Sequence, residues 1–178
     1  MAYTAPRTWV AGELVTAALG NTHWRDNLLE TAPAKATAEG GIFVATAANA
    51  IAERIPQTTF SSTNRTTAST SFVELTGALT VTVTTGTLAL VMINAHLFNA
   101  TVGSTQRLSY AVSGATTIAA NDSWALTSTM AAANAGLQAT MHDFPTLTAG
   151  SNVFTLNART TGGTMTADNQ RLTVIPLS

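Results

Sequence analysis

Apolar and polar residues alternate along much of the chain after residue 56. Leu79, Val81 and Val83 alternate with threonines, which is the pattern of a strand with one buried face. The run from Leu88 to Phe98 is almost continuously apolar and predicts a central strand covered on both faces. Further strands are predicted at Ser71–Leu75, Gln106–Val112, Leu137–Phe144, Asn152–Arg159 and Arg171–Pro176.

Turn signals separate these strands, among them Ser113-Gly114 and Gly162-Gly163. Many short strands without a βαβ rhythm predict a mostly β domain, an antiparallel jelly-roll-like β-sandwich. An immunoglobulin-like sandwich is the second choice, because the Cys-Trp-Cys framework is missing. Residues 121–136 are the least regular stretch and predict a long exposed loop around Trp124.

The first 55 residues follow a different pattern, beginning with a helix over about 16–30. Thr16 is a suitable N-cap, and the helix is expected to end before Pro33. One predicted face carries Ala17, Gly20 or Asn21, Trp24 and Leu28, and the opposite face carries Arg25, Asp26 and Glu30. A single amphipathic helix of this length cannot bury its own apolar stripe, so it requires a partner surface. That surface is its own β domain, the same helix of a sister chain, or a larger assembly.

A small β-hairpin is predicted at about 42–55, after a linker at residues 31–41. Ile42 and Val44 fall in its first strand, Ile51 and Ile55 in its second, and residues 47–50 form the turn. Because an isolated two-stranded hairpin is marginally stable, this segment also requires a partner. The chain therefore divides into an attachment and oligomerisation arm at 1–56 and a β-sandwich domain at 57–178, preceded by that helix and hairpin.

The low net charge of the chain limits the classes of partner that it can bind. The net charge is −1 and charged residues make up 10% of the chain, against roughly 25% in a typical soluble domain. No basic footprint for nucleic acid is present. No run approaches the about 18 apolar residues of a membrane span, and the start of the chain does not have the pattern of a signal peptide. With so few surface charges, either the Thr and Ser hydroxyls carry the solvation or other subunits cover much of the surface, and the second interpretation is favoured.

The three histidines do not assemble a catalytic constellation by sequence. His142 and Asp143 are adjacent, so in a strand they point to opposite faces and cannot act as base and orienting acid. His96 lies in the long apolar strand, which favours a core or intersubunit role, and His23 belongs to the predicted helix. No second ligand or acid stands at a telling spacing.

The carboxylates after residue 56 are scattered and form no close pair suited to glycoside hydrolysis. Asn121-Asp122-Ser123 and Asp168-Asn169-Gln170 offer oxygens for calcium, but Asx turns are the favoured interpretation. A nucleotide-binding loop of the Gly-rich, Lys-containing type is absent from the sequence. We therefore predict no catalytic residue, no metal site and no cofactor, and the chain is not expected to be an enzyme.

Trp124 is the candidate for receptor contact. It lies in an irregular polar segment, where an exposed aromatic ring can stack on a sugar or touch a protein. The competing interpretation is that Trp124 plugs the end of the sandwich or a subunit interface.

Two segments of the arm resemble a known family. The segment Thr8 to Ala17, followed by Asn21 and Arg25-Asp26-Asn27-Leu28, resembles the opening of tail-associated proteins of phages and prophages of actinobacteria. The segment Gly41 to Pro56 is similar to a hairpin motif of phage fibre proteins, which begins with Gly-Asp and ends in Arg-Leu-Pro. This sequence departs from that motif at Gly41 and at Glu53. The resemblance covers about the first third of the chain.

The resemblance implies a structural protein of a tailed-phage virion, made in the host cytoplasm and located on the particle. Its partners would be itself, as a homotrimer, other virion proteins, and a host-surface glycan or protein, without nucleic acid or membrane insertion. The residues assigned to virion attachment and oligomerisation are Trp9, Leu14, Trp24, Arg25, Asp26, Leu28, Ile42, Val44, Ile51 and Ile55.

Three other functions compete with this tail-fibre or spike assignment. A capsid decoration or head-fibre protein uses the same plan of arm and projecting domain. A monomeric carbohydrate-binding module would bind a glycan through Trp124. A depolymerase would need a carboxylate cluster that the sequence does not show.

Overall fold

The computed structural model describes residues 7–29, 31 and 35–178. The chain divides into two compact units, residues 1–55 with Ser178 and residues 56–177, and each is described by itself. Across the described ranges, the model contains no helix of the length and apolarity needed to span a bilayer.

The first unit opens with a short helical segment in three parts: α1 (Ala17–Gly20), the π-helical turn η1 (Asn21–Asp26) and α2 (Asn27–Leu29). Thr16 caps α1 as predicted, since its hydroxyl accepts a hydrogen bond from the Leu19 N–H at 3.3 Å. The expected regular helix instead widens directly after Gly20, a residue that weakens α-helix. The predicted end at Glu30, before Pro33, lies outside the described residues.

The hairpin consists of β1 (Ile42–Ala47) and β2 (Ala50–Arg54), paired antiparallel. Its turn is shorter than the four residues expected, because Ala47 already pairs with Ala50. Asn49 adopts φ 57°, a left-handed conformation that asparagine tolerates and that such a tight turn requires.

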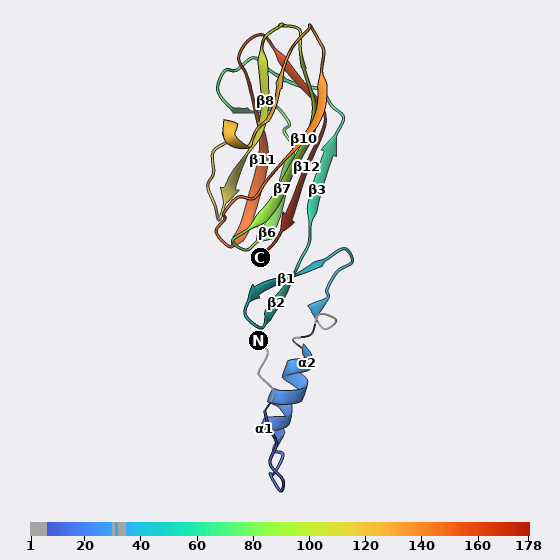
Figure 1. Cartoon of the computed structure of the whole chain (residues 1–178), viewed down its shortest axis with the longest axis vertical. Helices are drawn as coiled ribbons and strands as arrows, with labels where there is room; N and C mark the ends of the chain where they lie inside the picture. Colours follow the sequence, from blue (N-terminus) through green and yellow to red (C-terminus); the bar gives the residue numbers. More distant parts are fainter. Residues whose placement is uncertain (1–6, 30, 32–34) are drawn as a thin grey trace. The chain divides into compact units, whose positions relative to one another are not determined.

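The second unit is an antiparallel β-sandwich of two five-stranded sheets (Figure 1). The first sheet has the order β10-β7-β12-β3, with β4 also pairing with β12, and the second has the order β5-β11-β8-β9, with β6 also pairing with β11. The first sheet contains β3 (Gln57–Ser61), β4 (Arg65–Thr67), β7 (Ala89–Asn99), β10 (Leu137–Asp143) and β12 (Met165–Pro176). The second contains β5 (Val73–Glu74), β6 (Thr80–Thr85), β8 (Thr105–Gly114), β9 (Leu126–Thr129) and β11 (Gly150–Thr160). This is the predicted mostly β, jelly-roll-like architecture.

The prediction of a long loop at residues 121–136 was wrong in part. It contains the 3-10 turn η2 (Asp122–Trp124) and then strand β9, which pairs with β8. Strand β12 also begins earlier than predicted, at Met165 instead of Arg171. A bulge lies between Asp168 and Arg171, with Asn169 at φ 46°. Because the bulge interrupts the alternation of buried and exposed residues, the sequence pattern does not show that the strand is continuous.

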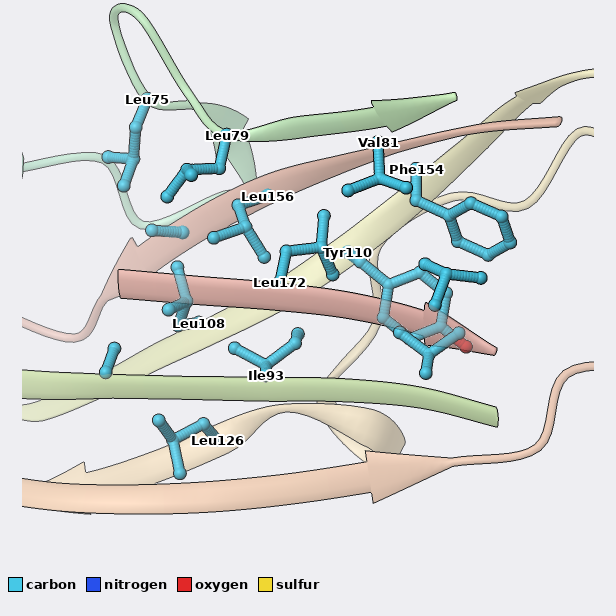
Figure 2. Packing of buried hydrophobic residues seen from close by; sticks show 14 of the residues in the cluster. Leu75, Leu79, Val81, Ile93, Leu108, Tyr110, Leu126, Phe154, Leu156 and Leu172 are labelled. Carbon is cyan, nitrogen blue, oxygen red and sulfur yellow. The ribbon is translucent and has the colours of Figure 1, made fainter. Parts of the chain in front are cut away.

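The core lies between the two sheets. Ile93 and Leu172 from one sheet meet Tyr110, Phe154 and Leu156 from the other, and all five are fully buried (Figure 2). Along β7 every second residue is buried and the residues between them are half-buried. We expected β7 to be buried on both faces. Its inner face is buried, whereas its outer face is only half-buried.

Candidate functional site

The helical segment of the arm carries an aromatic cleft of about 550 Å³. Trp9, Trp24 and Leu28 line it, together with Arg7, His23, Asn27 and Thr31. The Trp9 and Trp24 rings lie 6.1 Å apart, and the His23 ring meets Trp9 edge-on at 6.1 Å. The structure thus brings three of the predicted attachment residues into one surface.

A cation borders this cleft. The Arg7 guanidinium lies 4.9 Å from the centre of the Trp9 ring, within the range of a cation–π contact, and pairs with Glu13. The Nδ1 atom of His23 is buried and has no hydrogen-bond partner among the described residues. Sequence reasoning assigned neither Arg7 nor His23 to the site, because the fold of residues 7–24 has to bring them beside Trp9.

The apolar residues of this segment remain largely exposed. Trp24 is 56% exposed, Leu28 66% and Leu14 79%. None of residues 17–29, all of which the structure describes, is buried. Leu14 lies outside the lining of the cleft, and Arg25 pairs with its neighbour Asp26 at 2.8 Å. The segment therefore presents apolar surface that its own unit, residues 1–55, does not cover.

The hairpin holds its assigned residues on two faces. Val44 is buried and Ile42, two residues before it, lies on the same face, whereas Ile51 pairs with Ala45 and lies on the other face. Ile55 follows the end of β2 and is half-buried. The structure therefore does not gather the four residues into a single apolar stripe.

Glu53 ties the segment before the hairpin to strand β2. Its carboxylate accepts hydrogen bonds from the Thr37 N–H at 2.7 Å, from the Ala38 N–H at 3.3 Å and from the Thr37 hydroxyl. These hydrogen bonds lower the pKa of Glu53. A Cβ at Gly41 would collide with the Glu53 side chain, so Gly41 leaves room for it. The pair fixes the chain that leads into β1.

Trp124 packs partly against the sandwich core and lines a pocket of about 260 Å³. Its ring centre lies 6.3 Å from that of Tyr110, and Phe144 at the same pocket is 52% exposed. The buried Trp124 Nε1 atom finds no hydrogen-bond partner within the part of the chain that the structure describes. Trp124 is thus partly buried against the core and also borders a small pocket.

A carboxylate lies at this pocket. The Tyr110 hydroxyl donates a hydrogen bond of 2.6 Å to Asp143 Oδ2 from a fully buried ring. Burial of Tyr110 raises its pKa, and the Asp143 carboxylate raises it further. Asp143 points inward, paired with Val91, while His142 pairs with Met92 and points outward, as their adjacency predicts.

Asp122 joins an ion-pair network on the second sheet. It pairs with Arg159 and lies 3.5 Å from Arg107, and the hydrogen bond with Arg159 lowers the pKa of Asp122. Asn121 forms the expected Asx turn, its side chain accepting from the Ser123 N–H at 2.9 Å. The second expected Asx turn is instead the bulge of β12.

His96 pairs with Asp168, at 2.8 Å between Nδ1 and Oδ1. Sequence spacing did not indicate this pair, because strand register places the two residues opposite each other although they are 72 positions apart. Within the described ranges, no group of three or more His, Cys, Asp or Glu side chains gathers where a metal ion would bind.

No protein-family model and no curated protein matches this sequence. Solved structures share the fold. A chain from infectious bursal disease virus, Gx strain, has a TM-score of 0.51 at 11% identity, covering 75% of this chain and 36% of its own. The VP2 subviral particle of the same virus gives a TM-score of 0.46 at 13% identity, covering 77% of this chain and 38% of its own. This chain thus spans little more than a third of the length of either, and its likeness to the Gx-strain chain is one of fold: a jelly-roll-like β-sandwich.

Proposed function

We propose that this chain is a structural protein of a tailed-phage virion, attached by residues 1–56 and projecting its β-sandwich as a homotrimer. The observation that carries the proposal is the exposed apolar surface of the helical segment around Trp9, Trp24 and Leu28. The resemblance of the arm to tail-associated phage proteins supports it. The solved chain of similar fold also comes from a virus, although fold alone does not fix function.

The arm surface is suited to cooperative attachment. Burying an exposed Trp24, Leu28 or Leu14 side chain stabilises a contact by roughly 1.5–3 kcal/mol each. Three such residues sum to about 5–9 kcal/mol, which is similar to the 4–15 kcal/mol that association costs in lost freedom. One arm alone would therefore bind weakly. Several arms held together by oligomerisation would bind firmly through avidity.

Immunogold electron microscopy tests this function. Antibodies against residues 57–178 should label particles assembled with the wild-type chain and fail to label particles assembled with Trp24→Ser or Leu28→Ser. Val102→Ser is the matched control, because Val102 is 60% exposed but lies in the sandwich. Gold along the tail supports the fibre or spike role, and gold over the head supports the capsid decoration or head-fibre variant. Absence of label from wild-type particles would refute both.

A second candidate function, glycan binding, is favoured by the pocket beside Trp124. Its apolar walls and the Asp143 carboxylate match the chemistry of a sugar, which has an apolar face and hydroxyl donors. On a glycan array, binding that Trp124→Ala and Phe144→Ala abolish would support a receptor-binding role. The same result with a chain that is monomeric would favour the carbohydrate-binding module.

A further inference from the structure

The outer face of the first sheet is organised in rows by the register of its strands. Met92 at the centre of β7 lies beside His142 of β10 and Thr173 of β12. The next row joins Asn94 to Thr140 and Arg171. The outward residues of β7 are Leu90, Met92, Asn94, His96 and Phe98, and all are half-buried. With Ile175 beside Leu90 and Phe60 beside Arg171, apolar groups run the length of this face.

The outer face of the second sheet has a different composition. Strand β6 presents Thr80, Thr82 and Thr84 to solvent, and β9 presents Thr127 and Thr129. Its apolar side chains on the two central strands are Val153 and Ala111. Both outer faces carry threonine hydroxyls, including Thr58, Thr140 and Thr173 on the first, but the central strands of the first face also carry Leu, Met, Phe and Ile side chains.

Several polar groups of the first face are already bonded to one another. The Asn94 amide donates to the Thr140 hydroxyl at 2.6 Å, and the Thr58 and Thr173 hydroxyls lie 2.8 Å apart. His96 bonds Asp168, and the Arg171 guanidinium lies 5.2 Å from the centre of the Phe60 ring. Polar groups satisfied within the sheet lose little when water is removed from the face.

The size and charge of this face fit a copy of the same chain. At about 3.3 Å per residue and about 4.8 Å between strands, the strands β10, β7, β12 and β3, with 7, 11, 12 and 5 residues, cover about 550 Å². Two copies would bury about 1,100 Å² together, just above the roughly 1,000 Å² that a specific interface needs. The face carries one carboxylate, Asp168, and one guanidinium, Arg171, so identical copies do not repel each other.

We propose that copies of this chain pack together through the outer face of the β10-β7-β12-β3 sheet, with Met92 near the centre of the interface. The proposal rests on the homo-oligomer of the proposed function and assigns it a surface. The threonine-rich face of the second sheet stays in solvent.

Light scattering on the full chain tests this interface with matched charge insertions. Met92→Arg and Thr140→Arg place a cation on the proposed interface, and Val153→Arg places one at a half-buried apolar position on a central strand of the opposite face. The wild type and Val153→Arg should share one oligomeric mass, and Met92→Arg and Thr140→Arg should fall to the mass of one chain, a threefold drop for a trimer. Near-UV circular dichroism establishes that each variant is folded.

The interface is overturned if folded Met92→Arg or Thr140→Arg keeps the wild-type mass, if Val153→Arg dissociates as well, or if the wild type is a monomer. Should Met92→Arg fail to fold, Thr140→Arg decides, because Thr140 is exposed and tolerates a larger side chain. Immunogold labelling separates this inference from the proposed function. Labelled particles with an unchanged Met92→Arg mass reject the interface alone, and unlabelled particles with a dissociated variant reject the attachment role alone.

Discussion

Replacing Tyr110 by Phe isolates one hydrogen bond of the sandwich. The ring is fully buried and its hydroxyl donates to Asp143 at 2.6 Å, so Tyr110→Phe removes the bond and keeps the packing. A hydrogen bond to a charged group contributes about 1.5–3 kcal/mol. Because Asp143 is only half-buried and water can replace the lost donor, we expect about 1.5 kcal/mol. For a chain of this length that corresponds to a drop in Tm of roughly 3–6 °C.

The same substitution changes the response to alkaline pH. Burial and the Asp143 carboxylate raise the pKa of Tyr110, so the folded state holds the phenolic proton more firmly than the unfolded state. The resulting stability is complete below the unfolded pKa of about 10 and is lost as pH rises toward the folded pKa. The advantage of the wild type over Tyr110→Phe should therefore shrink above pH 10.

Urea unfolding at pH 8 and pH 10.5 measures both effects. Asp143→Asn is the companion variant, because it keeps the shape of the acceptor and removes its charge, and it should lose part of the same free energy at pH 8. Equal unfolding free energies for wild type and Tyr110→Phe at pH 8 would refute the reasoning. So would an unfolding free energy that falls by the same amount in both proteins between pH 8 and pH 10.5.

Two further predictions concern the second sheet. Arg159 and Arg107 hold the pKa of Asp122 below its ordinary range, so the stability from this network is present above the unfolded pKa of about 3.9 and is lost as pH falls through the folded pKa. Urea unfolding should show wild type more stable than Asp122→Asn at pH 7, with the gap closing by pH 3; a constant gap contradicts this. Gly114→Ala should lower Tm more than Gly77→Ala. Both glycines have positive φ, but an added Cβ at Gly114 would lie 2.5 Å from the Ser151 carbonyl oxygen, whereas at Gly77 it meets open space. Equal losses in thermal melts would show that the contact is relieved elsewhere.

The strands that the sequence predicts well are those whose burial alternates. β6 buries Val81 and Val83 between exposed threonines, and β7 and β11 alternate along their whole length. β3 and β4 were not predicted, because their threonine-rich residues are nowhere buried and owe their strand conformation to pairing with β12. The bulge of β12 is likewise set by distant contacts, since the Gln170 amide bonds the carbonyls of Ala167 and Thr63.

The residues of the candidate sites also divide into those that local sequence patterns predict and those that only the fold brings together. Trp9, Trp24 and Leu28 were found from the sequence because their motif and helical spacing are local. Arg7, His23 and the pair of His96 with Asp168 were missed, because ring stacking and strand register bring them together. The sequence indicated only indirectly that the outer face of the first sheet is apolar. The run of β7 is almost continuously apolar, whereas a strand with one face in solvent needs apolar residues only at every second position.

The account depends on apolar surface that neighbouring chains must cover, and the molecular mass in solution tests it most directly. Light scattering should give three times the mass of one chain for the full-length protein over a wide range of concentrations. A single-chain mass for both the full-length protein and a chain lacking residues 1–56 would contradict the account.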